Sequence, residues 1–110
     1  MNLPIVAVGD VPDPLPEGLA VLDVREGFEW DAGHIDGAHH VPLGDLAERL
    51  AEVSEAQTLV VCKAGGRSGQ AVAWLVEQGY DAVNLDGGML DWESAGRPMV
   101  SETGAPPRVV

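Results

Sequence analysis

Cysteine, basic side chains and long apolar runs are all scarce in this chain. Its 110 residues include one cysteine and six lysine or arginine residues, and the net charge is -12. A single cysteine excludes a disulfide within the chain and a metal site built from several cysteines. The acidity disfavours nucleic acid as a partner. No run is long enough for a membrane span and the N-terminus lacks the pattern of a signal peptide, so we expect a cytoplasmic protein without a membrane partner.

What is present indicates one folded α/β domain. The hydrophobic share of 45% is sufficient for a core, and strand-like apolar runs alternate with helix-like stretches. Strands are predicted at residues 5–8, 20–24, 38–41, 58–61 and 82–85. Helices are predicted at residues 28–32, 43–53, 68–78 and 89–95. This alternation predicts a mostly parallel central sheet of about five strands with helices on both faces.

The expected organisation has three parts. Residues 1–14 form an N-terminal strand and a proline-rich loop, and residues 15–99 form the main domain. Residues 100–110 have no periodic pattern and are predicted to be a flexible tail.

The one cysteine, Cys62, stands where reactive groups of α/β proteins are found. It directly follows the apolar run 58–61, and a glycine-rich turn with Lys63 and Arg67 leads from it into a predicted helix. Backbone N–H groups of such a turn, at the start of a helix, bind anions and favour a thiolate over a thiol. A buried apolar cysteine that ends a core strand is the alternative interpretation. The glycines and the two cations of the turn favour the first interpretation, in which Cys62 is a nucleophile that reacts with a small bound anion.

Four segments of the chain resemble rhodanese-like sulfurtransferases. Residues 62–68, Cys-Lys-Ala-Gly-Gly-Arg-Ser, resemble the active-site loop Cys-x-x-Gly-x-Arg-Ser of that family. The other three are residues 21–26, residues 33–39 with Pro42, and residues 85–89 with Trp92, Gly96 and Pro98. In this order the four motifs cover about residues 20–99, and the resemblance implies a rhodanese-like domain.

The resemblance implies a relay of sulfur through a cysteine persulfide. Cys62 would take the outer sulfur of thiosulfate or a similar anionic donor and pass it to an acceptor such as cyanide, a thiol or a protein. No cofactor is expected. The residues implied to bind the donor and the persulfide are Lys63, Ala64, Gly65, Gly66, Arg67 and Ser68. Ser68, at the start of the predicted helix, could donate a hydrogen bond to the loop or cap the helix, and we expect the cap.

Two other functions remain open at this point. One is a non-catalytic sulfur-carrier or regulatory module, because an intact loop does not demonstrate turnover. The other is a cysteine-based phosphatase or arsenate reductase, whose loop has five residues between the cysteine and the arginine. Four residues separate Cys62 from Arg67, and the smaller loop suits sulfur better than a tetrahedral phosphate.

Polar residues outside the loop are assigned supporting roles. Asp23 and Arg25 lie at the carboxyl end of the strand 20–24, on the same expected edge of the sheet as Cys62. We expect them to pair and to support the site. No metal site is predicted, because the spacing of the three histidines matches no helical ligand pair.

Overall fold

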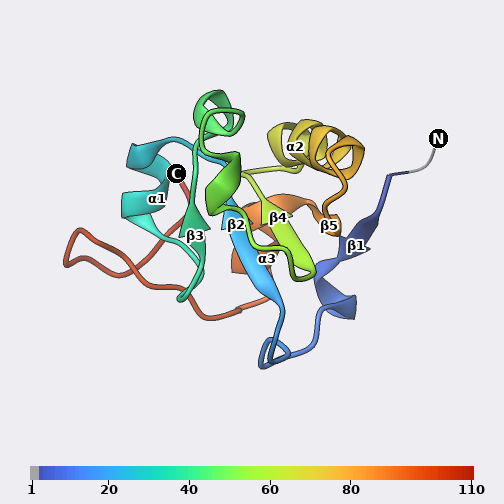
Figure 1. Ribbon diagram of the computed structural model, residues 1–110. Helices are drawn as coiled ribbons and strands as arrows, with labels where there is room; N and C mark the ends of the chain where they lie inside the picture. Colours follow the sequence, from blue (N-terminus) through green and yellow to red (C-terminus); the bar gives the residue numbers. More distant parts are fainter. Residues whose placement is uncertain (1–2) are drawn as a thin grey trace.

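A computed structural model describes residues 3–110 and contains a five-stranded parallel sheet (Figure 1). Its strands are β1 (Ile5–Ala7), β2 (Ala20–Asp23), β3 (His39–His40), β4 (Thr58–Val61) and β5 (Ala82–Asp86). They are arranged in the order β1-β5-β4-β2-β3, and every neighbouring pair is parallel. The predicted α/β class with a parallel sheet of five strands is therefore confirmed.

Within the described residues three α-helices accompany the sheet: α1 (Gly27–Ala32), α2 (Gly66–Glu77) and α3 (Gly88–Ser94). A short 3-10 segment, η1 (Val8–Asp10), follows β1. The central strand β4 is buried throughout, as expected for a parallel strand covered on both faces. Its alternate side chains enter two separate cores. Val60 and Cys62 pack in the core that includes Ala71, Val72 and Leu75 of α2. Leu59 and Val61 pack in the core that includes Met89 and Trp92 of α3.

The helix predicted over residues 43–53 is wrong. This segment instead forms two 3-10 turns, η2 (Leu43–Asp45) and η3 (Leu50–Glu52), joined by turns. A 3-10 turn places residues three apart on one face, so the apolar pairs Leu43–Leu46 and Leu50–Val53 meet the core without a continuous helix. Ala47 would share that face in an α-helix, and here it is exposed.

Residues 100–110, predicted as a flexible tail, are hydrogen-bonded to α1 at Glu102 and Arg108 and loop away between these points, and the chain ends beside that helix (Figure 1). His34 and Val100 form an antiparallel bridge, and the amide of Arg108 donates to the carbonyl of Ala32 at 3.0 Å. A Cβ atom on Gly33 would come within 2.5 Å of the Arg108 carbonyl oxygen, so glycine permits the close approach. These contacts join backbone atoms, which no side-chain pattern in the sequence reveals. The domain limits at residues 15 and 99 remain a prediction.

No helix within residues 3–110 has both the length and the apolar character needed to cross a membrane.

Candidate active site

The site is built at the carboxyl edge of the sheet, where β2 and β4 lie side by side. Their pairing continues beyond the strands, because the amide of Val24 donates to the carbonyl of Val61 at 3.0 Å. Cys62 follows β4 directly, and Arg25 follows β2 by two residues. Open α/β sheets carry their binding sites at the carboxyl ends of the strands. The topology therefore places the predicted nucleophile and its predicted supporting pair at the same edge.

The sulfur of Cys62 lies inside the turn that follows it. The residue is 1% exposed, and its Sγ accepts hydrogen bonds from the Gly65 amide at 3.1 Å and the Ser68 hydroxyl at 3.2 Å. Burial by itself raises the pKa of the Cys62 thiol. The Ser68 hydroxyl and the backbone N–H groups of Ser68, Gly65 and Ala64 together outweigh burial, so the pKa lies below that of an ordinary cysteine. The turn thus favours the thiolate.

The turn is held from behind by the start of α3. The amides of Met89 and Leu90 donate to the carbonyls of Cys62 and Lys63 at 2.8 and 3.0 Å. Gly88 has a φ of 58°, and a Cβ atom there would lie 2.5 Å from the Cys62 carbonyl oxygen. A side chain at position 88 would therefore displace the turn that carries the thiol.

Ser68 is not the N-cap of the helix, so that prediction is wrong. The N-cap is Gly65, whose φ of 108° lets α2 begin at Gly66, two residues earlier than predicted. Ser68 thus lies within the first turn of α2, fully buried, and donates no capping hydrogen bond. Its hydroxyl instead contacts the loop, as in the alternative role for Ser68, and lies between Cys62 Sγ at 3.2 Å and Asn84 Oδ1 at 2.6 Å.

Asn84 is a site residue that the sequence analysis missed. It is a buried polar residue in β5, and its Nδ2 donates to the Gly65 carbonyl at 3.1 Å. The available signal was a single amide side chain within the otherwise apolar run 82–85. That signal is weak, because it becomes informative only once β5 is known to lie next to β4.

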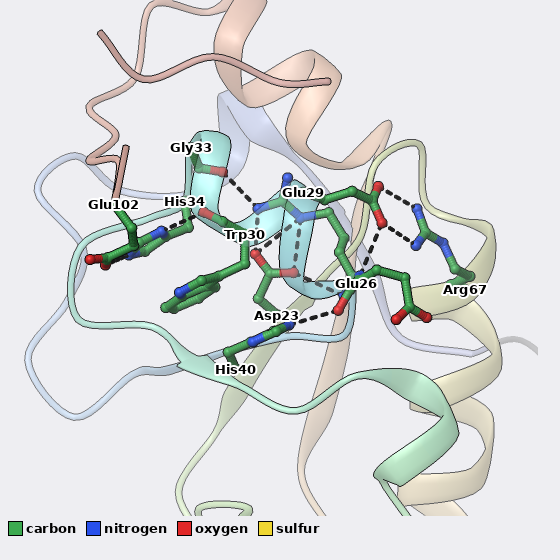
Figure 2. A network of polar contacts seen from close by, with 10 residues as sticks. Asp23, Glu26, Glu29, Trp30, Gly33, His34, His40, Arg67 and Glu102 are labelled. Atoms are coloured by element: carbon green, nitrogen blue, oxygen red, sulfur yellow. Dashed lines mark hydrogen bonds and ion pairs between the residues drawn. The ribbon is translucent and has the colours of Figure 1, made fainter. Parts of the chain in front are cut away.

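Arg67 is bound by a carboxylate that the sequence analysis also missed. Its Nη1 and Nη2 donate to the two carboxylate oxygens of Glu29 in α1, at 2.7 and 2.9 Å (Figure 2). Glu29 is 4% exposed, and its hydrogen bond from Arg67 lowers the pKa of the carboxyl despite burial, with a further contribution from the backbone of Glu26. The charge of Arg67 at the mouth of the turn is therefore largely neutralised by Glu29. Lys63 has no acidic partner among the ion pairs of residues 3–110.

The predicted pair of Asp23 and Arg25 is present and fully buried. Arg25 Nη2 donates to Asp23 Oδ2 at 2.6 Å and to the Gly33 carbonyl at 2.8 Å, and its Nε donates to Asp23 Oδ1 at 2.9 Å. Within residues 3–110, Arg25 Nη1 is the one buried side-chain polar atom without a partner. The pair links β2 to the end of α1, the helix that also supplies Glu29.

The histidines make local contacts. The ring of Trp30 stacks on His34 and His40 at centroid distances of 3.5 and 4.8 Å (Figure 2). His34 Nδ1 donates to the Trp30 carbonyl at 2.8 Å, and His40 Nε2 donates to the Arg25 carbonyl at 2.7 Å. In the part of the chain that the structure describes, no cluster of three histidine, cysteine or acidic residues could hold a metal ion.

Comparison with known proteins finds relatives that are similar to this chain in sequence. Over 80 residues the chain is 40% identical to the thiosulfate sulfurtransferase GlpE of Pseudomonas putida, covering 71% of this chain and 73% of that protein. It is 43% identical over 84 residues to the probable adenylyltransferase/sulfurtransferase MoeZ of Mycobacterium tuberculosis. That match covers 73% of this chain but only 21% of the length of MoeZ.

The fold and the family model agree with these relatives. The crystal structure of a rhodanese-related protein from Thermoplasma volcanium superposes with a TM-score of 0.83 and 31% sequence identity. The superposition covers 88% of this chain and 97% of the other. The family model for the rhodanese-like domain matches residues 8–95. The chain therefore belongs to the rhodanese-like domain family, as its sequence motifs indicate.

Proposed function

We propose that this protein is a sulfurtransferase in which Cys62 carries sulfur as a persulfide. The Cys62 thiolate attacks the outer sulfur of thiosulfate or a similar donor, the sulfur–sulfur bond of the donor breaks, and sulfite leaves with the bonding electron pair. A thiophilic acceptor, either cyanide or a thiol, then attacks the outer sulfur of the persulfide and releases the Cys62 thiolate. The activity named for GlpE supports this reaction.

The observation that carries the proposal is the hydrogen-bonded sulfur within the turn. Gly65 N–H and the Ser68 hydroxyl both contact Cys62 Sγ, and the pKa of the thiol is lowered. The same donors suit the anionic sulfur of a persulfide, because fixed N–H groups stabilise charge without reorganising during the reaction. Since the reaction needs this thiol reduced, the proposal places the protein in the cytoplasm.

The donor would be held by the turn and its two cations. Lys63, which has no acidic partner within residues 3–110, supplies a positive charge, and the amides from Lys63 to Ser68 supply donors. Arg67 meets the donor while still bound to Glu29. A small dianion and a persulfide on another protein both suit this arrangement, and the choice of donor decides between them experimentally.

Direct detection of the persulfide tests the proposed reaction. The protein is incubated with thiosulfate and its intact mass is measured, with sulfite determined in the same sample. We expect one added sulfur atom per chain and an equal amount of sulfite, followed by loss of that sulfur as thiocyanate on addition of cyanide. A thiol that reacts with alkylating agents but takes sulfur from no donor in a panel of thiosulfate, cysteine persulfide and glutathione persulfide would instead indicate a regulatory module.

Replacing Glu29 should change the affinity for dianionic donors. In Glu29→Gln the carboxylate charge beside Arg67 is lost, and the guanidinium becomes more available to an anion. We expect the KM for thiosulfate to fall about fivefold at low ionic strength, with a smaller fall in high salt. Steady-state kinetics over a range of salt concentrations measures this change.

A control variant removes the same charge elsewhere. Glu52→Gln in η3 breaks the ion pairs of Glu52 with Arg49 and His39 and changes the net charge equally. Its KM for thiosulfate should remain unchanged. If Glu29→Gln raises the KM, the main role of the ion pair is to hold Arg67 and the turn in place.

A further inference from the structure

The hydroxyl group of Ser68 lies between two acceptors but has only one proton to donate. Cys62 Sγ lies 3.2 Å from it and Asn84 Oδ1 lies 2.6 Å from it. The orientation of the Asn84 amide follows from its other contact, because the Gly65 carbonyl can only accept and therefore faces Nδ2 at 3.1 Å. Oδ1 must then face Ser68, and it can only accept. Both acceptors compete for one hydrogen.

The protonation state of Cys62 decides how this competition ends. While Cys62 is a thiol, Ser68 can donate to Asn84, and the thiol can donate to the Ser68 oxygen, so all three groups are satisfied. Once Cys62 is a thiolate it can only accept. If Ser68 then donates to the sulfur, Asn84 Oδ1 loses its partner in a buried position, and an unpaired buried acceptor is unfavourable.

From this geometry we propose that Asn84 is a positioning residue that controls the thiolate of Cys62 through the proton of Ser68. The assignment rests on the proposed role of Cys62 as the nucleophile. Asn84 does not touch the sulfur. It stabilises the thiol form by accepting the hydrogen bond that the thiolate requires, and it anchors the turn through Gly65.

The two roles of Asn84 have opposite effects on the pKa of the Cys62 thiol. Loss of the Oδ1 acceptor frees the Ser68 proton for the sulfur and favours the thiolate. Loss of the Nδ2 donor loosens Gly65, whose amide also contacts the sulfur at 3.1 Å, and disfavours the thiolate. A single substitution therefore mixes two effects, and a cycle of variants separates them.

The experiment measures the pKa of Cys62 from the pH dependence of its alkylation by iodoacetamide, which follows the thiolate. Because the chain has one cysteine, the reaction reports on Cys62 alone. The four proteins are the wild type, Asn84→Ala, Ser68→Ala and the double variant. In the Ser68→Ala background, Asn84→Ala acts through Gly65 only. The pKa shift that Asn84→Ala causes in the wild type, minus the shift that it causes in Ser68→Ala, isolates the effect transmitted by the hydroxyl.

We compare the change in the pKa of Cys62 that Asn84→Ala causes in the two backgrounds. We expect this change to be more negative by about half a unit when Ser68 is present than when it is replaced by alanine. Equal shifts in both backgrounds, or a difference of opposite sign, would overturn the proposal. If the alanine variants fail to fold, Asn84→Leu fills a similar volume without an acceptor and completes the same cycle. Alkylation needs no sulfur donor, so this result stands apart from whether the protein transfers sulfur.

Discussion

Replacing Cys62 with serine should abolish sulfur transfer while leaving the fold intact. The serine hydroxyl fits the same position and can still accept from Gly65, but it forms no thiolate and no persulfide. We expect thiosulfate:cyanide activity to fall on the order of a thousandfold or more, to the background rate. The matching mass measurement should show no added sulfur atom.

The control for this variant is its stability. A thermal unfolding curve close to that of the wild type would show that the loss of activity is chemical. A Cys62→Ser protein that kept full activity would contradict the persulfide mechanism altogether, because the chain has no other cysteine to take over the role.

Among the substitutions proposed for this protein, replacing Asp23 with alanine should produce the largest loss in the free energy of unfolding. Arg25 is fully buried. Without Asp23, the only hydrogen-bond partner left to its guanidinium would be the backbone carbonyl of Gly33. Breaking a buried ion pair by removing one partner costs about 3–5 kcal/mol. Chemical denaturation, with the midpoint and slope both measured, checks this expectation.

A matched double variant tests the origin of that loss. Asp23→Leu combined with Arg25→Met removes both charges at similar volume and should recover most of the stability, because no buried charge remains unpaired. The kinetic constants then separate two roles. An unchanged kcat in the folded double variant indicates that the pair only supports the fold, and a lower kcat indicates that it also positions the active-site turn.

The parts of the fold that the sequence predicted well are those with a local signal. The apolar run Thr58–Val61 forms β4 with the predicted bounds, and the helical spacing after it forms α2. The helix predicted over residues 43–53 is wrong because an apolar spacing of three residues fits a 3-10 turn as well as an α-helix. Ser68 was misassigned for a related reason: the helix start depends on the left-handed φ of Gly65, two residues earlier.

The candidate site shows the same division between local and distant information. Cys62 and its turn are contiguous in sequence, so a motif could identify them. Glu29 is 38 positions from Arg67, and Asn84 is 16 positions from Ser68. Only the arrangement of β2, β4 and β5 brings these side chains to the turn. Neither residue belongs to a recognisable pattern on its own, so their contributions could not be predicted before the fold was known.

The depth at which Cys62 Sγ lies has a consequence for the direction of the second half-reaction. A persulfide has two electrophilic sulfurs, and only attack on the terminal one completes a transfer. Attack on the inner one would expel hydrosulfide and leave a mixed disulfide on the protein. Because Cys62 is 1% exposed and its Sγ lies against Gly65 and Ser68, the inner sulfur of a persulfide would be less accessible to an acceptor than the terminal sulfur. For the proposed intermediate, the packing around the thiol therefore favours attack of the acceptor on the terminal sulfur.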